Sequence, residues 1–238
     1  MIEPDGKEHV CERCGECCIN GSPTLHLSDF KLFEENIVTL NNVYTLRKGE
    51  LIYDNIGEEL DYLKEEMIKI KEIPGVKTCI FYGSENRDCK IYDTRPYQCV
   101  YFECWNPKKF FETLSEEKLS RGDLFGKVPA IREFVEAHEE RCGYRKLEEL
   151  FDKTQEGSEE AAGEILEILE YDTHIRPFIV EKLNVPAEST DLIFGRPLAE
   201  TVKMFGYKVE KDDEGNYFLM VDKENNETYN SGRSNSPL

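Results

Sequence analysis

The sequence Cys11-Glu12-Arg13-Cys14-Gly15-Glu16-Cys17-Cys18 places four cysteines within eight residues. Four more follow between residues 79 and 104, namely Cys79, Cys89, Cys99 and Cys104, and Cys142 completes the nine cysteines of the chain. An odd number excludes full disulfide pairing within one chain. The first residues lack the apolar core of a secretory signal, so we expect a cytoplasmic protein whose thiols stay reduced. Clustered cysteines in such a chain predict thiolate metal ligands.

The spacing within the first group indicates which metal sites are possible. Cys11-x2-Cys14-x2-Cys17 matches the first three ligands of a bacterial ferredoxin loop, but the Cys-Pro that supplies the fourth ligand is absent. A fourth thiolate must therefore come from Cys18 or from the second group. In extended chain the side chains of Cys17 and Cys18 would point to opposite sides, so they would serve different metals, or one would not be a ligand. Eight cysteines are enough for two four-cysteine sites, but their number does not establish that there are two.

The cysteine pattern resembles a known family at several further positions. The motif C-x2-C-G-x-C-C, followed by C-x9-C-x-I-Y-x2-R-P-x2-C, is similar to the zinc- or iron-chelating cysteine-cluster proteins of the YkgJ type, often labelled Fe–S oxidoreductases. The resemblance covers residues 8–105 and implies metal binding through seven cysteines. Cys104 and Cys142 lie outside the motif. Flagellin lysine methylases carry a similar cluster. The matching residues are Cys11, Cys14, Gly15, Cys17, Cys18, Cys79, Cys89, Ile91, Tyr92, Arg95, Pro96 and Cys99.

Several other residues are candidates for the site. Arg95 would donate to cluster sulfurs or anchor an anionic substrate, or it would form a salt bridge with Asp93. Tyr92 would screen a bound cofactor from water or belong to the core. Cys104 is a possible eighth ligand because it follows Cys99 closely. Cys142 and His138 share a helical face and could bind metal, but we favour apolar packing for both.

Three histidines and the rest of the chain offer weaker signals. His9 could bind metal, although exposure is the simpler interpretation, and His26 and His174 belong to no motif. The chain has no Walker loop, no G-x-G-x-x-G, no H-E-x-x-H and no G-x-S-x-G. No Glu-x-x-His pair suggests a di-iron site.

The preferred function is therefore an iron–sulfur protein acting in electron transfer or a redox reaction, with a [4Fe–4S] cluster as cofactor. One alternative is a zinc-stabilised interaction module without catalysis. A second alternative, which rests only on the resemblance, is a cluster-containing methylase-like enzyme.

The charge of the chain limits the partners that we expect. Lys and Arg number 30 against 49 Asp and Glu, which gives a net charge of −19. Binding to nucleic acid or to an anionic membrane needs a high density of cations, so neither is expected as a partner. A redox or protein partner remains possible, and the sequence leaves the oligomeric state open.

The hydrophobic pattern predicts an α+β fold. We expect a cysteine-cluster domain over residues 1–105, a mainly helical region packed on it over 106–223, and a disordered tail over 224–238. Predicted hairpins cover 38–53, 79–92 and 207–221, the last turning at 213–216. Predicted helices cover 58–72, a short segment from Pro96 through Cys99, 129–141, 146–155, 158–173 and 197–205, and Pro177 should break or kink the pattern.

Overall fold

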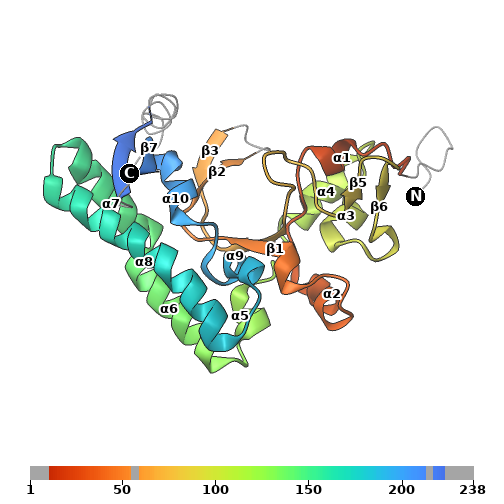
Figure 1. Ribbon diagram of the computed structural model, residues 1–238. Helices are drawn as coiled ribbons and strands as arrows, with labels where there is room; N and C mark the ends of the chain where they lie inside the picture. The colour runs from red at the N-terminus through yellow and green to blue at the C-terminus, as the bar shows by residue number, and fades with distance from the viewer. Residues whose placement is uncertain (1–10, 55–58, 213–216, 223–238) are drawn as a thin grey trace. The chain divides into compact units, whose positions relative to one another are not determined.

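The computed structural model describes residues 11–54, 59–212 and 217–222, and its fold is α+β (Figure 1). The chain forms two compact units. Unit 1 consists of residues 1–44 and 67–126, and unit 2 of residues 45–66 and 127–238. Both units are discontinuous in sequence, because the segment 45–66 belongs to unit 2 although unit 1 surrounds it in the chain.

Unit 1 is built from short elements. Its helices and 3-10 turns are α1 (Glu16–Ile19), η1 (Leu27–Asp29), α2 (Phe30–Glu34), η2 (Leu40–Asn42), η3 (Tyr92–Thr94), α3 (Tyr97–Tyr101), α4 (Pro107–Thr113) and α5 (Arg121–Phe125). The strands β5 (Tyr82–Gly83) and β6 (Asp88–Cys89) form a small antiparallel hairpin. Strand β4 (Met67–Ile70) pairs with β1 (Val43–Leu46), whose first two residues lie in unit 1.

The core of unit 1 forms around an extended segment at Leu25. The Leu25 N–H donates to the carbonyl of Ile68 at 2.8 Å, and the Leu119 N–H donates to the carbonyl of Leu25 at 3.0 Å. All three side chains are fully buried. Segments far apart in the sequence thus satisfy one another's backbone groups around one apolar centre.

Unit 2 contains the long helices and two antiparallel hairpins. Its helices and 3-10 turns are α6 (Pro129–Cys142), α7 (Tyr144–Gln155), α8 (Glu159–Leu183), η4 (Ala187–Ser189), α9 (Thr190–Phe194), α10 (Leu198–Thr201) and η5 (Val202–Phe205). The hairpins are β2 (Leu51–Asp54) with β3 (Glu59–Tyr62), and β7 (Tyr207–Lys211) with β8 (Tyr217–Val221). Helix α8 contacts α6, α7, α9 and β8, so it is the central element of the unit (Figure 1).

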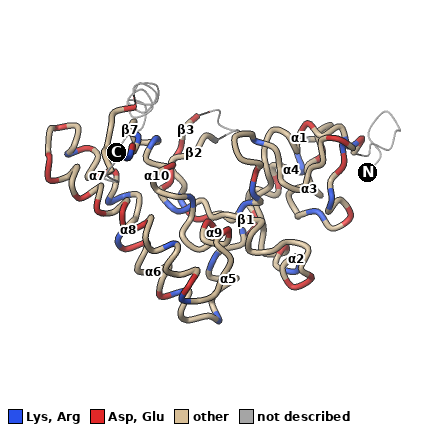
Figure 2. The backbone as a smooth tube through the Cα atoms, in the orientation of Figure 1, with Lys and Arg blue, Asp and Glu red and all other residues tan. Residues whose placement is uncertain are grey.

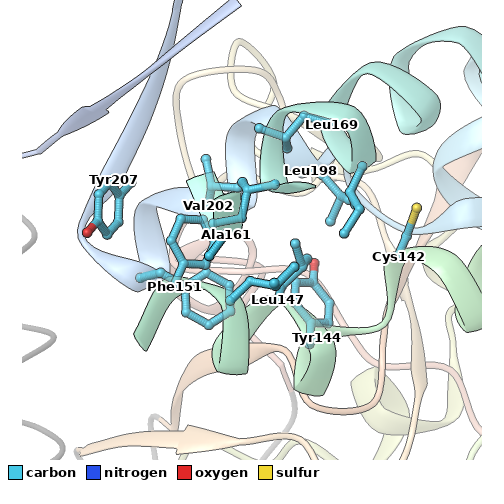
Figure 3. Packing of buried hydrophobic residues seen from close by; sticks show 13 residues of the cluster. Cys142, Tyr144, Leu147, Phe151, Ala161, Leu169, Leu198, Val202 and Tyr207 are labelled. Carbon is cyan, nitrogen blue, oxygen red and sulfur yellow. The ribbon is translucent and has the colours of Figure 1, made fainter. Parts of the chain in front are cut away.

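The core of unit 2 packs α7, α8, α10 and η5 together. Figure 3 shows Leu147 and Phe151 of α7 facing Ala161 and Leu169 of α8. The ring of Phe151 stacks on that of Phe205 with centroids 4.5 Å apart. Burying large apolar and aromatic side chains in this way is the main stabilising contribution to such a bundle.

Acidic residues recur along the unit 2 helices. Figure 2 shows Asp and Glu at intervals along α6, α7 and α8. Several of them pair with Lys or Arg, such as Glu149 with Arg145 at 3.4 Å and Glu164 with Lys146 at 2.7 Å. None of the described helices combines the length and apolarity that a membrane crossing requires.

Two sequence predictions in the region 38–72 are wrong. The expected helix over 58–72 is instead β3, a bend and β4, because Ile68 and Ile70 alternate with the partly exposed Met67 and Lys69. The expected hairpin over 38–53 does not form, because β1 pairs with β4 and β2 pairs with β3. Pairing with strands outside the segment 58–72 overrides its local three- and four-residue spacing of apolar residues.

Most other predicted elements are confirmed. Helices occur at 129–142, 144–155 and 159–183, and Gly206, with φ 78, follows the helical segment that ends at Phe205. Helix α8 continues through Pro177 rather than ending there. The hairpin of β7 and β8 is also confirmed. Its predicted turn at 213–216 and the predicted tail at 224–238 lie outside the described residues.

Candidate metal centre

The first cysteine group is shaped by two left-handed backbone positions. Arg13 has φ 56 and Gly15 has φ 88, and helix α1 starts directly after Gly15. The N–H groups of Cys18 and Ile19 donate to the carbonyl of Gly15 at 2.8 and 2.9 Å. The two turns fold the loop back, so that Cys11 and Cys14 lie in the loop whereas Cys17 and Cys18 lie on α1.

The second cysteine group is attached to the first at two points. The Cys79 N–H donates to the Cys18 carbonyl at 2.8 Å. A Cβ built on Gly15 would lie 2.0 Å from the Tyr82 hydroxyl oxygen, so the backbone of the loop directly abuts the ring of Tyr82 in β5. Only glycine fits both this approach and the backbone angle. The loop of the first group and the hairpin of the second therefore form one structure.

Cys17 and Cys18 lie side by side rather than on opposite sides of the chain. Both are on α1, so the assumption of extended chain at this point is wrong, and their Sγ atoms are 3.8 Å apart. A hydrogen bond from the Cys18 thiol lowers the pKa of Cys17 to about 6, and donating that bond raises the pKa of Cys18. One of the two sulfurs is thereby prepared as a thiolate, the form that binds metal.

The cysteines of the second group lie on different elements. Cys79 precedes β5, Cys89 is in β6 and Cys99 is on α3, as the predicted hairpin and short helix require. Burial raises the pKa of Cys79 to about 11, and it also raises the pKa values of Cys89 and Cys99. The charges of Cys79, Cys17 and Cys89 raise the pKa of Cys99 further.

Cys104 lies near the other end of the first group. Desolvation raises the pKa of the Cys104 thiol, and the charge of Cys14 followed by that of Cys11 raises it further. Cys11, Cys14 and Cys104 are all exposed. Cys17 is exposed as well, whereas Cys18, Cys89 and Cys99 are partly buried and Cys79 is buried.

Two arginines stack on one tyrosine beside these thiols. The guanidinium carbon of Arg13 lies 3.9 Å from the centroid of the Tyr92 ring, and that of Arg95 lies 4.0 Å from it. Arg13 belongs to the first cysteine group, and Tyr92 and Arg95 belong to the second. This contact therefore brings positive charge from both groups to one place by cation–π interaction.

The charge and the hydrogen-bonding state of Arg95 indicate whether this site suits a thiolate-bound metal. Its charge lowers the pKa of Cys17, and it opposes the effect of burial on the pKa values of Cys89 and Cys99. Its Nε is buried and has no hydrogen-bond partner among the described residues. A free N–H beside several thiols suits an anionic thiolate centre, because such centres are stabilised by donors to sulfur.

The ligand positions themselves are not assembled in the way that a bound ion would require. Among residues 11–54, 59–212 and 217–222, no three His, Cys, Asp or Glu side chains are placed to hold one metal ion. The donor set nevertheless fits in its chemistry, because it consists of sulfur and includes one thiol with a lowered pKa. Soft sulfur ligands of this kind select zinc, copper(I) or iron–sulfur clusters.

Cys142 and His138 lie in unit 2 and do not form a metal pair. Cys142 is fully buried in the apolar core, as we favoured (Figure 3). His138 is also fully buried, but its Nε2 is 2.8 Å from Asp172 Oδ1 and its Nδ1 is 3.4 Å from a nitrogen of Arg47. Both ring nitrogens therefore already have protein partners. His26 is buried and His174 is exposed, and His9 lies outside the described residues.

Sequence reasoning missed Arg13 and Arg47. Arg13 could have been noticed as a cation inside the C-x2-C loop of an acidic chain. Arg47 is fully buried, and its partners Glu139 and the Cys142 carbonyl are far along the chain, so no local pattern marks it.

The cysteine content of unit 1 is typical of a class of protein in which a short cysteine-rich domain offers sulfur ligands to a metal. A family model described as "CxxCxxCC: Putative zinc- or iron-chelating domain" matches residues 10–143, and the chain belongs to this family. The matched range is more than half of the chain and contains all nine cysteines. No solved structure matches the chain.

Proposed function

We propose that the cysteines of unit 1 hold an iron–sulfur cluster, of the [4Fe–4S] type, and that the protein acts in electron transfer or a redox reaction. Family membership supports the coarser part of this statement, metal chelation with zinc or iron. The finer part rests on the ferredoxin spacing of Cys11, Cys14 and Cys17 and on a donor set made of sulfur. A bound cluster of this type would take up and release one electron.

The observation that carries the proposal is the position of Arg95. Its guanidinium carbon lies 4.0 Å from the centroid of the Tyr92 ring, which also carries Arg13 of the first group. Its charge lowers the pKa values of Cys17 in the first group and of Cys89 and Cys99 in the second relative to what burial alone would give. A cluster with four thiolates is anionic, and a cation with a free Nε–H beside it stabilises that charge. Arg95 and Tyr92 are accordingly assigned as residues that contact the cofactor.

A mononuclear zinc site is the second candidate, and one distance favours it. Two sulfurs on the same tetrahedral zinc, each ~2.3 Å from the metal, lie about 3.8 Å apart. The Sγ atoms of Cys17 and Cys18 are separated by 3.8 Å. In an iron–sulfur cluster each cysteine Sγ binds a different iron atom, so two such Sγ atoms lie farther apart than two that share one zinc ion. In this alternative the metal stabilises the fold of unit 1 without redox chemistry.

Metal analysis of protein purified without oxygen separates the two candidates. An iron–sulfur protein should be brown, should contain both iron and acid-labile sulfide, and should change its electron paramagnetic resonance spectrum on reduction. Colourless protein that contains stoichiometric zinc and no sulfide would refute the cluster and support the zinc module.

Replacing single cysteines tests which residues bind the metal. Cys14→Ser should lose most of the bound metal, because it removes one of the proposed sulfur ligands. Cys14 is exposed, so the replacement should disturb little packing. Cys142→Ala is the matched control and should keep its full metal content, because Cys142 lies in the apolar core of unit 2. Loss of metal from the Cys142 variant alone would contradict the ligand assignment.

A further inference from the structure

A pocket of about 390 Å³ in unit 1 belongs to no part of the cysteine site. It is lined by His26, Leu27, Ser28, Tyr97, Glu116 and Glu117. These residues come from the start of η1, from α3 and from the segment that follows α4. The volume is within the range of pockets that bind small molecules or a single side chain.

His26 is the unusual residue of this pocket. The residue is only 3% exposed, and neither ring nitrogen has a hydrogen-bond partner of normal geometry among the described residues, the nearby backbone of Glu116 acting on the ring only weakly. Leaving a buried polar group without a partner costs about 1–3 kcal/mol, so such groups are rare unless they serve a purpose. The imidazole lines the pocket, where a ligand would supply the missing partner.

The backbone around His26 is fixed before any ligand arrives. Asp29 is 2% exposed, and its carboxylate accepts the N–H of His26 at 2.9 Å and the N–H of Tyr97 at 2.7 Å. The Leu27 N–H donates to the carbonyl of Glu117 at 3.0 Å. One buried carboxylate and one backbone bond thus connect all three segments of the pocket wall, so binding needs little reorganisation.

The groups that face the pocket accept hydrogen bonds and carry negative charge. Burial lowers the pKa of His26, so its imidazole is neutral at pH 7 and presents a lone pair. Glu116 and Glu117 add two carboxylates, and the Tyr97 ring lies 5.1 Å from the imidazole. Lys118 is the nearby cation, and its Nζ donates to the carbonyl of Leu114. A carboxylate pair with an aromatic ring and a free lone pair suits a positively charged donor.

We propose that this pocket binds an organic ammonium group, with His26 and Glu116 accepting its N–H donors and Tyr97 covering its apolar stem. A metal ion is disfavoured, because these residues are not among any group of three placed to hold one in the described part of the chain. The ammonium group could belong to a free polyamine or to a lysine side chain of a peptide, which present the same chemistry.

The binding test uses the full-length, metal-loaded protein and n-butylammonium as the probe, at pH 7.5 and constant ionic strength. Ring ¹⁵N resonances of the histidines are followed by nuclear magnetic resonance. The His26 signals should shift saturably, and those of the exposed His174 should not. n-Butanol and butyrate should leave the His26 signals in place. Equal shifts with n-butanol, tighter binding of butyrate, or no saturable shift would each overturn the proposal.

Variants separate a binding role from a structural one. His26→Phe should retain or gain thermal stability, because it removes an unpartnered polar group, yet it should bind the probe roughly tenfold more weakly. Glu116→Gln, at an exposed position, should weaken binding about threefold. Glu34→Gln, an exposed change on α2 in the same unit, is the matched control and should bind as the parent does. Unchanged binding by the His26 and Glu116 variants would refute the site.

Two larger probes identify the source of the ammonium group. Nα-acetyl-lysine methylamide represents a peptide side chain, and spermidine represents a free polyamine. Tighter binding of the lysine derivative than of n-butylammonium assigns a peptide, and tighter binding of spermidine assigns a polyamine. Failure of both to displace n-butylammonium would contradict the assignment of the pocket to either source.

Discussion

Gly15 is the residue at which the two cysteine groups meet most closely. A Cβ there would lie 2.0 Å from the Tyr82 hydroxyl oxygen, and its φ of 88 is unfavourable for any residue with a side chain. We predict that Gly15→Ala destabilises unit 1 by roughly 2–4 kcal/mol, combining backbone strain with overpacking. Chemical denaturation followed by Trp105 fluorescence measures this change, because Trp105 is the single tryptophan of the chain and lies in unit 1.

Gly75 provides a matched control for this substitution. Its φ of 82 is close to that of Gly15, but a Cβ at Gly75 would meet nothing within 4 Å. Gly75→Ala should therefore show the backbone cost alone, about 1–2 kcal/mol. Equal effects of the two substitutions would mean that the contact with Tyr82 does not contribute.

His138 is a second residue whose environment makes a measurable prediction. Burial lowers its pKa, although the hydrogen bond to Asp172 opposes that effect and the charge of Arg47 adds to it. The folded state therefore disfavours protonation of His138. Because the pKa is lower in the folded state than the ~6.5 of an unfolded chain, stability is present above pH 6.5 and is lost as the pH falls below it.

Replacing His138 should weaken this pH dependence. We expect the free energy of unfolding of unit 2 to fall between pH 7 and pH 5 in the parent, and to fall less in His138→Gln, which retains a donor for Asp172 but does not titrate. Urea denaturation followed by circular dichroism gives the two slopes. His174→Gln, at an exposed histidine, should keep the parental slope. If the slope of His138→Gln equals that of the parent, His138 is not the group that titrates.

At the scale of elements, α8 tolerates a proline in its interior. The helix runs from Glu159 to Leu183 with Pro177 inside it, and Pro177 is exposed. A proline within a helix removes one hydrogen bond and crowds the preceding turn, at a cost of about 3 kcal/mol relative to alanine. The cost is offset by tertiary contacts of α8, whose Asp172 bonds to His138 of α6 at 2.8 Å and accepts the Leu198 N–H at 2.9 Å.

This cost predicts that Pro177→Ala stabilises unit 2. We expect an increase of about 1–3 kcal/mol in the free energy of unfolding, measured by urea denaturation. Pro186→Ala should instead lower the free energy of unfolding, by about 0.4–1 kcal/mol. Pro186 precedes η4 with φ −60, an angle that suits proline, so the substitution only removes the restriction that the proline places on the unfolded chain. A loss of stability in Pro177→Ala would show that the proline is required by packing.

Elements also show where local patterns are reliable. The helices α6, α7 and α8 follow from their own apolar spacing and from capping, since the Ser158 hydroxyl accepts the Ala161 N–H at 3.2 Å. The segment 58–72 has similar spacing but forms strands, because β3 pairs with the preceding strand β2 and β4 pairs with β1, and both partners lie outside the segment. Information about those partners is absent from the segment itself.

At the scale of the whole molecule, the cysteines all lie in unit 1 except Cys142, whereas the long helices lie in unit 2. We predict that removing the metal with a chelator under reducing conditions lowers the thermal midpoint of unit 1 by more than about 10 °C, because metal binding contributes to folding. Trp105 fluorescence reports unit 1. Far-UV circular dichroism, to which α6, α7 and α8 contribute most, reports unit 2 and should change little.

Restoring the metal is the control for this experiment. If the native cofactor is an iron–sulfur cluster, added iron with sulfide should return the fluorescence midpoint to its initial value. If the native metal is zinc, added zinc should do so. If removal of the metal lowered the thermal midpoints seen by fluorescence and by circular dichroism equally, the two units would unfold together and the metal would stabilise both.

The sequence by itself determined the donor chemistry and the class of fold. Cysteine spacing is covalent and local, so Cys11, Cys14, Cys17 and the later cysteines could be recognised without coordinates, as could the α+β pattern and the long helices. Tertiary structure alone decided that Cys17 and Cys18 lie side by side, that Arg13 and Arg95 share the Tyr92 ring, and that His26 lines a pocket without a partner. Those features depend on contacts between segments far apart in the chain, and burial and proximity of that kind leave no periodic trace in the sequence.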